Sequence, residues 1–113
     1  MKTVNILGTT YKIEYVKAVD DKNIDEGGDA YCDWTTKCIV LQDPKDADGN
    51  LGNMSAYWKK TLRHEIIHAF MFESGLAQNS LSVGAWAQNE EMVDWFAFNG
   101  PKIYAVWEKV GCV

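Results

Sequence analysis

The chain has 113 residues, of which 47 % are hydrophobic and 24 % are charged, and its formal net charge is −5 at pH 7. This length fits one compact domain with a modest core, so we expect a single domain over residues 1–113. The acidic balance, without any run rich in Lys and Arg, argues against nucleic acid or an anionic membrane surface as the main partner. We expect a protein that binds neither.

The cysteines point to a reducing compartment. There are three, Cys32, Cys38 and Cys112, which is an odd number. The N-terminus alternates like a strand, and no apolar run approaches the ~20 residues that span a bilayer. We therefore expect a cytoplasmic monomer with free thiols, and a bridge between Cys32 and Cys38 is the less favoured alternative.

Two strand pairs are predicted in the N-terminal half. Residues 4–16, "VNILGTTYKIEYV", have β-branched and aromatic residues on both sides of Gly8-Thr9-Thr10, which predicts a hairpin. The polar residues 20–30 predict a loop or a short helical turn. Residues 31–43, "YCDWTTKCIVLQD", predict a second pair that turns at Thr35-Thr36 into an apolar strand from Cys38 to Leu41.

The longest predicted helix follows a loop rich in Pro, Asp and Gly over residues 43–53. It runs from Ser55, as N-cap, to about Ser74 and ends at Gly75. Placing residues at about 100° steps separates a sector that faces water, which includes Arg63, from an apolar stripe. A third sector contains the two histidines of the chain.

Two further helices are predicted near the C-terminus. The first runs from about Gln88 to Phe98 and stops at Asn99-Gly100, and the second restarts at Pro101 and continues to about Val110. Together these elements predict an α+β fold, in which a small twisted N-terminal sheet packs on the long helix and two helices follow.

Residues 61–70, "TLRHEIIHAF", place a glutamate directly after the first of two histidines four positions apart. His64 and His68 project from one side of a helix, so both imidazoles can reach one Zn²⁺ at roughly 2.0–2.1 Å. Glu65 is rotated by about 100°, too far for a third ligand but close enough to act as base on a metal-bound water. The three residues predict a site for one zinc ion per chain. The alternative is two histidines that fill a semi-polar groove.

A hydrolytic zinc centre needs a third protein ligand. In "NEEMVDWFA", residues 89–97, Glu90 and Asp94 lie on one face of a helix, whereas Glu91 points about 100° away. A carboxylate one turn from the ligand is well placed to accept the N–H of a zinc-bound histidine. The alternative is that both glutamates are helix-start carboxylates favoured by the helix dipole.

The pattern His64-Glu65-x-x-His68 followed by Asn89-Glu90-x-x-x-Asp94 resembles the gluzincin metallopeptidases. In that family a second helix supplies the third zinc ligand. A short chain with a sheet before the motif helix is similar to the minigluzincin and phage ImmA-type peptidase domains. The resemblance covers roughly residues 31–98. It implies that Glu90 is the ligand and Asp94 the partner of a zinc-bound histidine, with Glu91 as the alternative ligand.

Three other features concern catalysis. Larger gluzincins hold the oxyanion with a His or Tyr, and because no further histidine is present, Tyr57 and Tyr104 are the candidate donors, with a role as core or rim aromatics as the alternative. The strand from Cys38 to Leu41 would bind an extended peptide if it lies at a sheet edge, and the alternative is an ordinary buried strand. Cys112 is either a thiolate that caps the zinc or part of a frayed tail, and we expect the tail.

The sequence therefore predicts a zinc-dependent peptidase that acts on a peptide or protein, with Glu65 as general base. One alternative is a metal-binding regulatory or protein-binding module of the same fold with little or no hydrolytic activity. Another is a metal-free interaction domain. Deformylases also carry this motif, but they need an upstream cysteine ligand in a Gly-Cys setting that Cys32 and Cys38 lack.

Overall fold

The computed structural model describes residues 2–80, 86 and 89–113 and has an α+β fold, as predicted. Its sheet has four strands in the order β1-β2-β4-β3. The first hairpin pairs β1 (Lys2–Ile6) with β2 (Thr9–Val16) in antiparallel fashion. Its two-residue turn has Leu7 at φ 51° and Gly8 at φ 95°, the left-handed conformation that joins twisted strands without splaying them. The predicted hairpin is confirmed, but its turn is Leu7-Gly8 and not Gly8-Thr9-Thr10, because Thr9 and Thr10 already belong to β2.

The second hairpin joins β3 (Ala30–Asp33) to β4 (Cys38–Gln42), again antiparallel and as predicted. The Asp33 carboxylate accepts the backbone N–H groups of Thr35 and Thr36 and so shapes the turn. β4 also pairs with β2 in parallel, which makes β4 a central strand and leaves β3 at the edge. The condition for peptide binding at Cys38 to Leu41 is therefore not met, because that strand has neighbours on both sides and is the ordinary buried strand of the alternative.

The long helix α2 (Met54–Glu73) contains the two histidines. Its N-cap is Asn53, whose side chain accepts the N–H of Ala56, and Ser55 lies inside the first turn instead of capping it. The helix stops before Gly75, which has φ +83° and is followed by the short helix α3 (Leu76–Asn79). The predicted helix is confirmed with its N-terminus two residues earlier.

The C-terminal helices are one helix, α4 (Glu90–Val110), with Pro101 in its interior. The predicted break at Asn99-Gly100 is wrong. The side chain of Asn99 donates to the carbonyl of Trp95 at 3.0 Å in the turn before Pro101, and Ile103 and Val110 are buried against the rest of the protein. Packing of the residues that follow the proline thus outweighs its local cost, and asparagine and glycine stay helical.

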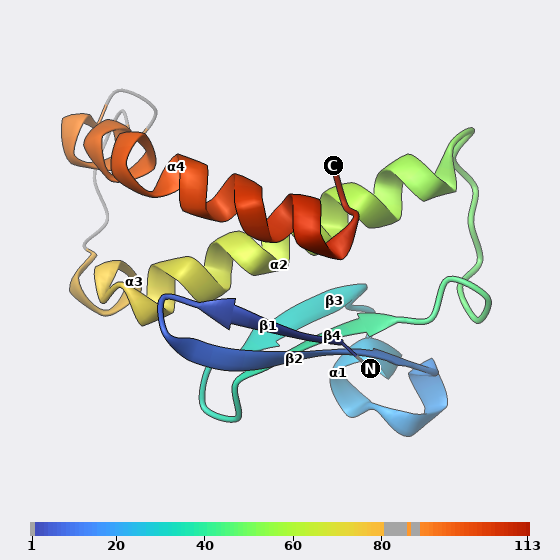
Figure 1. The fold of residues 1–113 in the computed structure, drawn as a ribbon. Coiled ribbons are helices and arrows are strands. Elements are labelled where there is room, and N and C mark those ends of the chain that lie inside the picture. The colour runs from blue at the N-terminus through green and yellow to red at the C-terminus, as the bar shows by residue number, and fades with distance from the viewer. Residues whose placement is uncertain (1, 81–85, 87–88) are drawn as a thin grey trace.

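Figure 1 shows α2 and α4 crossing the same face of the sheet. α2 contacts β1, β3 and β4, and α4 contacts β1. The core between the layers consists of buried apolar side chains from strands and helices: Val4, Ile6, Tyr11, Ile13, Ile39, Leu41, Leu62, Ile66, Ala69, Phe70, Ile103 and Val110. In the part of the chain that the structure describes, no helix is both long and apolar enough to cross a membrane.

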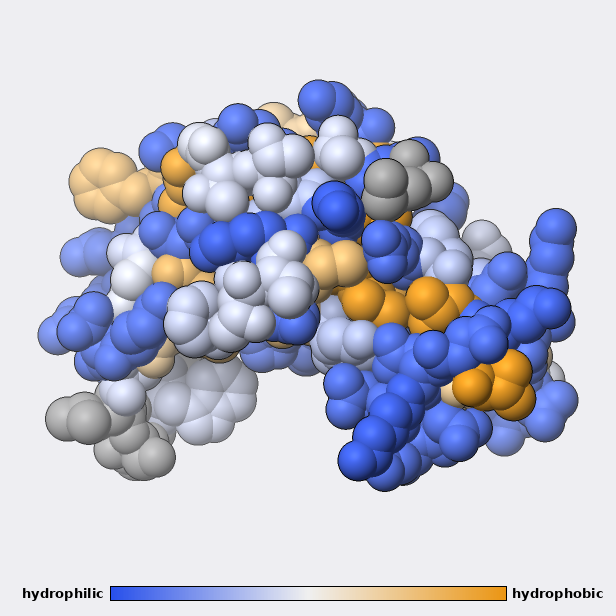
Figure 2. All heavy atoms as spheres, turned by 90° about the horizontal axis from the view of Figure 1, so that it is seen from below, coloured by the Kyte–Doolittle hydropathy of each residue, from blue (hydrophilic) through white to orange (hydrophobic). Residues whose placement is uncertain are grey.

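On the other face of the sheet, the 3₁₀ turn η1 (Ala18–Asp20) and the short helix α1 (Lys22–Asp25) cover one end. Ile24 of α1 is buried, as is Val40, and Tyr31 of β3 donates to Asp21 at 2.6 Å. Hydrophilic side chains cover most of this underside (Figure 2). The histidines belong to α2 and so lie on the opposite, helix-covered side of the sheet.

Candidate metal centre

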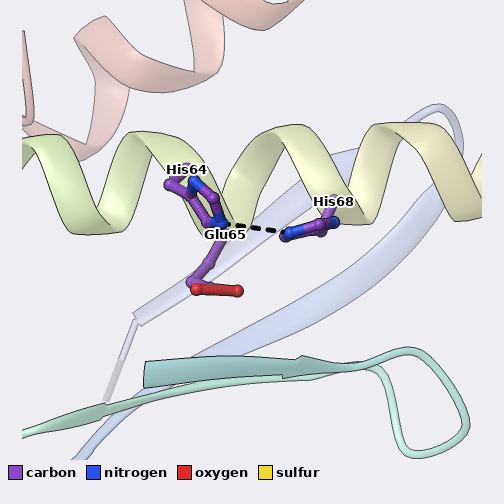
Figure 3. A group of neighbouring side chains, drawn as sticks. All are labelled: His64, Glu65 and His68. Atoms are coloured by element: carbon purple, nitrogen blue, oxygen red, sulfur yellow. Dashed lines mark hydrogen bonds between the residues drawn. The ribbon is translucent and has the colours of Figure 1, made fainter. Parts of the chain in front are cut away.

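His64, Glu65 and His68 lie in the middle of α2 and form a compact group (Figure 3). The Nε2 atoms of the two histidines are 3.1 Å apart, and their ring centroids are 4.7 Å apart. One potential ligand atom from each of the three residues lies within 4.8 Å of the others. Within residues 2–80, 86 and 89–113, this is the one group of three or more His, Cys, Asp or Glu side chains that could hold a metal ion.

The spacing of the two imidazoles suits a divalent cation. Two ligands of a tetrahedral Zn²⁺ at roughly 2.0–2.1 Å stand about 3.3 Å apart, close to the 3.1 Å between the two Nε2 atoms. Both histidines are exposed, so an ion can reach them from solvent. The donor set of two nitrogens and a nearby carboxylate therefore fits zinc chemically, and equally fits other first-row cations that imidazole binds.

The protein environment favours the protonation states that metal chemistry needs. Partial desolvation of the ring, followed by the neighbouring His64, lowers the pKa of His68 below its usual range, which favours the neutral imidazole that binds metal. Burial raises the pKa of Glu65 above its usual range, against the opposite effects of His64 and Lys60. Glu65 is 6 % exposed and extends from α2 toward the strands (Figure 3). It is thus a shielded carboxylate with a strengthened hold on a proton.

The predicted third ligand, Glu90, is not part of this group. It is an exposed residue in the first turn of α4, which runs antiparallel to α2 (Figure 1). Trp95 donates to Ser74 at 3.2 Å, so that end of α4 lies beside the C-terminal end of α2. Six residues separate Ser74 from His68 and five separate Trp95 from Glu90. At 1.5 Å per residue, Glu90 lies about 16 Å along the helices from His68.

The other two carboxylates predicted near the metal, like Glu90, are separate from the histidines. Glu91 and Asp94 are also exposed on α4 and also lie outside the group around His64. Figure 3 shows α4 on the far side of α2 from the Glu65 side chain. The assignments of Glu90 as ligand, Asp94 as its neighbour and Glu91 as alternative stay predictions, and they require the first turns of α4 to approach the histidines.

The two candidate oxyanion donors lie in different surroundings. Tyr57 is half-buried on α2, two turns before His64, and its hydroxyl donates to Asp29 at the start of β3. This bond raises the pKa of Tyr57 above its usual range. Tyr104 is 53 % exposed and lies on α4. Tyr57 thus lies on the helix of the histidines with its proton engaged, whereas Tyr104 comes from the other helix.

Cys112 is buried, so the expectation of a frayed tail is wrong. Arg63 of α2 donates to the Cys112 carbonyl at 2.7 Å and ties the C-terminus of α4 to the long helix, instead of facing water as predicted. The thiol of Cys112 lies 3.6 Å from the carbonyl of Trp107. All three cysteines are free, as expected.

Sequence reasoning missed that β3 is the strand beside the histidines. α2 contacts β3 directly, and burial followed by the nearby Glu65 carboxylate raises the pKa of the Cys32 thiol to about 12. Cys32 packs against the core, so the edge of β3 runs along α2 close to Glu65. The position of β3 beside α2 follows from the order of strands in the sheet. The four residues of β3 alone do not indicate which elements are its neighbours.

Comparisons of this chain with protein-family models, curated proteins and solved structures find no match. The resemblance to gluzincins therefore rests on the motif residues, and the function must be argued from the geometry around His64.

Proposed function

We propose that this protein is a zinc-dependent peptidase with its active centre at His64, Glu65 and His68. The observation that carries the proposal is the pair of Nε2 atoms 3.1 Å apart on the exposed side of α2, next to a carboxylate that is 6 % exposed. Zn²⁺ bound by these imidazoles would supply Lewis acidity to a water molecule and to a substrate carbonyl. The proposal also includes Glu90 as the third ligand, because the pattern Asn89-Glu90-x-x-x-Asp94 resembles the ligand helix of gluzincins.

Glu65 acts as the general base. Its carboxylate accepts a proton from the water that attacks the peptide carbonyl carbon, and it returns that proton to the nitrogen of the leaving amine. A base works best when its pKa approaches the working pH. Burial shifts the pKa of Glu65 upward, in the direction that this role requires.

The edge of β3 supports a peptide substrate. β3 borders only β4 in the sheet, so one side of its backbone is free of strand partners along the described chain. An extended peptide can add to such an edge through main-chain hydrogen bonds. Since β3 packs beside α2 near Glu65, a peptide held there passes the histidines.

One observation favours a second candidate, a metal-binding regulatory module with little hydrolysis. The group offers two imidazoles and Glu65, while Glu90 lies about 16 Å away along the helices and the Tyr57 hydroxyl is bonded to Asp29. Such an arrangement can bind a metal without completing a catalytic centre.

Metal analysis and peptide cleavage test the proposal together. We expect one zinc ion per wild-type chain and its loss in His64→Ala and in His68→Ala. Glu65→Gln should keep zinc and lower the cleavage rate of a peptide library by about 10²- to 10⁴-fold. If the wild-type protein binds zinc but cleaves no peptide, the peptidase proposal fails and the regulatory module becomes the favoured function. If it binds no zinc, both proposed functions are refuted.

A further inference from the structure

A stacked aromatic pair lies one helical turn beyond His68. Trp34, in the turn between β3 and β4, stacks on Phe72 of α2 with ring centroids 5.5 Å apart and planes 16° apart. Phe72 follows His68 by four residues, so the two side chains project from adjacent turns on the same side of the helix. The pair therefore stands at the end of β3, next to the metal centre.

The pair is open to solvent and held in place. Trp34 is 42 % exposed, and the ammonium of Lys37 lies 5.7 Å from its ring centroid. Lys37 bonds to the Glu73 carboxylate at 2.8 Å, and Glu73 also accepts the hydroxyl of Tyr11 at 2.7 Å. These contacts fix the strand turn to the end of α2. An exposed aromatic surface that is already immobilised loses little conformational entropy when it binds a ligand.

We propose that Trp34 and Phe72 form a subsite for an aromatic or large aliphatic side chain of the peptide substrate. This inference rests on the proposed function, because the substrate reaches the pair by lying along β3 past the histidines. At 1.5 Å per residue, Phe72 lies about 6 Å along the helix axis from His68 and about 9 Å from the centre between His64 and His68. An extended peptide advances about 3.3 Å per residue. The preferred side chain therefore belongs to the second or third residue from the cleaved bond, on the side toward the β3–β4 turn.

The local charges favour a neutral side chain at this subsite. Lys37 is the cation next to Trp34, and its ion pair with Glu73 balances that charge. An acidic or basic substrate side chain would have to compete with this pair, whereas an aromatic ring gains contact area and stacking on Trp34. The occupant that fits is apolar and flat, or apolar and bulky.

Equilibrium binding to the zinc-loaded Glu65→Gln protein tests the subsite without cleavage. Two fluorescent peptides, identical except for Phe or Ala at one scanned position, are titrated and followed by anisotropy. We expect the Phe peptide to bind about tenfold more tightly at the second or third position from the bond that wild type cleaves, the scale of apolar pocket discrimination. The added change Trp34→Ala or Phe72→Ala should bring the ratio close to one, and Trp34→Phe should keep most of it.

Phe98→Ala is the matched control, since Phe98 is 80 % exposed on α4 and should leave the ratio unchanged. Thermal melting verifies that each variant folds. Equal binding of the two peptides, binding of neither, or a ratio that survives both Trp34→Ala and Phe72→Ala would overturn the subsite. Absence of zinc or of wild-type cleavage would instead refute the proposed function, and scanning every peptide position then still shows whether Trp34 and Phe72 select aromatic side chains.

Discussion

The same substitution at two positions of α2 should change stability in opposite directions. Glu65 and Glu73 are both shielded from water, at 6 % residue exposure for Glu65 and 12 % side-chain exposure for Glu73. Burial raises the pKa of Glu65. At Glu73 burial acts in the same direction, but bonds from Lys37, Tyr11 and Thr9 outweigh it and lower the pKa. The protein therefore tolerates the charge of Glu65 at a cost and uses the charge of Glu73 for stability.

Glutamine removes the charge and keeps the shape. Glu65→Gln relieves the burial of a carboxylate, and we expect the metal-free protein to gain on the order of 1 kcal/mol in free energy of unfolding. Glu73→Gln loses the ion pair at 2.8 Å and places an N–H₂ group among the donors Thr9, Tyr11 and Lys37. One bond to a charged group contributes about 1.5–3 kcal/mol, and because the amide oxygen still accepts from some of these donors, we expect a net loss near the size of one such bond, about 2–3 kcal/mol.

Melting followed by circular dichroism at pH 7 after EDTA treatment measures both effects. About 4 °C per kcal/mol applies to a chain of this length, so Glu65→Gln should melt about 4 °C higher and Glu73→Gln about 8–12 °C lower than wild type. If Glu65→Gln lowers the melting temperature as Glu73→Gln does, the carboxylate at position 65 makes stabilising bonds, and the argument for a base with a raised pKa fails.

Three further predictions follow from particular contacts. Because the folded-state pKa of Glu73 is lowered, its contribution to stability is complete above the unfolded-state value near 4.5 and is lost as pH falls through the lower folded value. Denaturant unfolding should accordingly show the gap between wild type and Glu73→Gln narrowing from pH 6 to pH 3, and a constant gap would contradict the lowered pKa. Glu90→Ala should weaken zinc binding by at least about tenfold and Glu91→Ala by less, measured by chelator competition, and the reverse order would reassign the ligand. Pro101→Ala should raise the free energy of unfolding by roughly 1–3 kcal/mol, and an unchanged chemical denaturation midpoint would show that the proline costs nothing in α4.

Local patterns predicted the elements that local forces determine. The Leu7-Gly8 turn, the Asp33 side chain at the second turn and Gly75 after α2 act within a few residues, so the hairpins and the long helix were predictable. The proximity of His64 to His68 is equally local, because helix geometry brings residues i and i+4 together. It is the part of the candidate site that sequence alone could supply.

Predictions failed where contacts between segments distant in the sequence determine the structure. Asn99, Gly100 and Pro101 favour a helix break, yet burial of Ile103 and Val110 keeps α4 continuous. The parallel pairing of β2 with β4 places β3 at the edge, and no pattern within the four residues of β3 records that order. Periodicity describes the face of one element and leaves the identity of its neighbour open.

Identifying the third ligand also requires knowing how two distant segments, α2 and α4, pack against each other. A pattern such as Glu90-x-x-x-Asp94 fixes two carboxylates relative to each other, whereas the histidines belong to another helix. In α4 the C-terminal half carries the buried anchors Ile103 and Val110, while Val93 and Phe98 in the N-terminal half are 54 % and 80 % exposed. The half that carries Glu90 is thus the half whose position packing determines least. Comparing zinc affinity in Glu90→Ala and Glu91→Ala measures that relation directly, because it reports which face of α4 turns to the histidines.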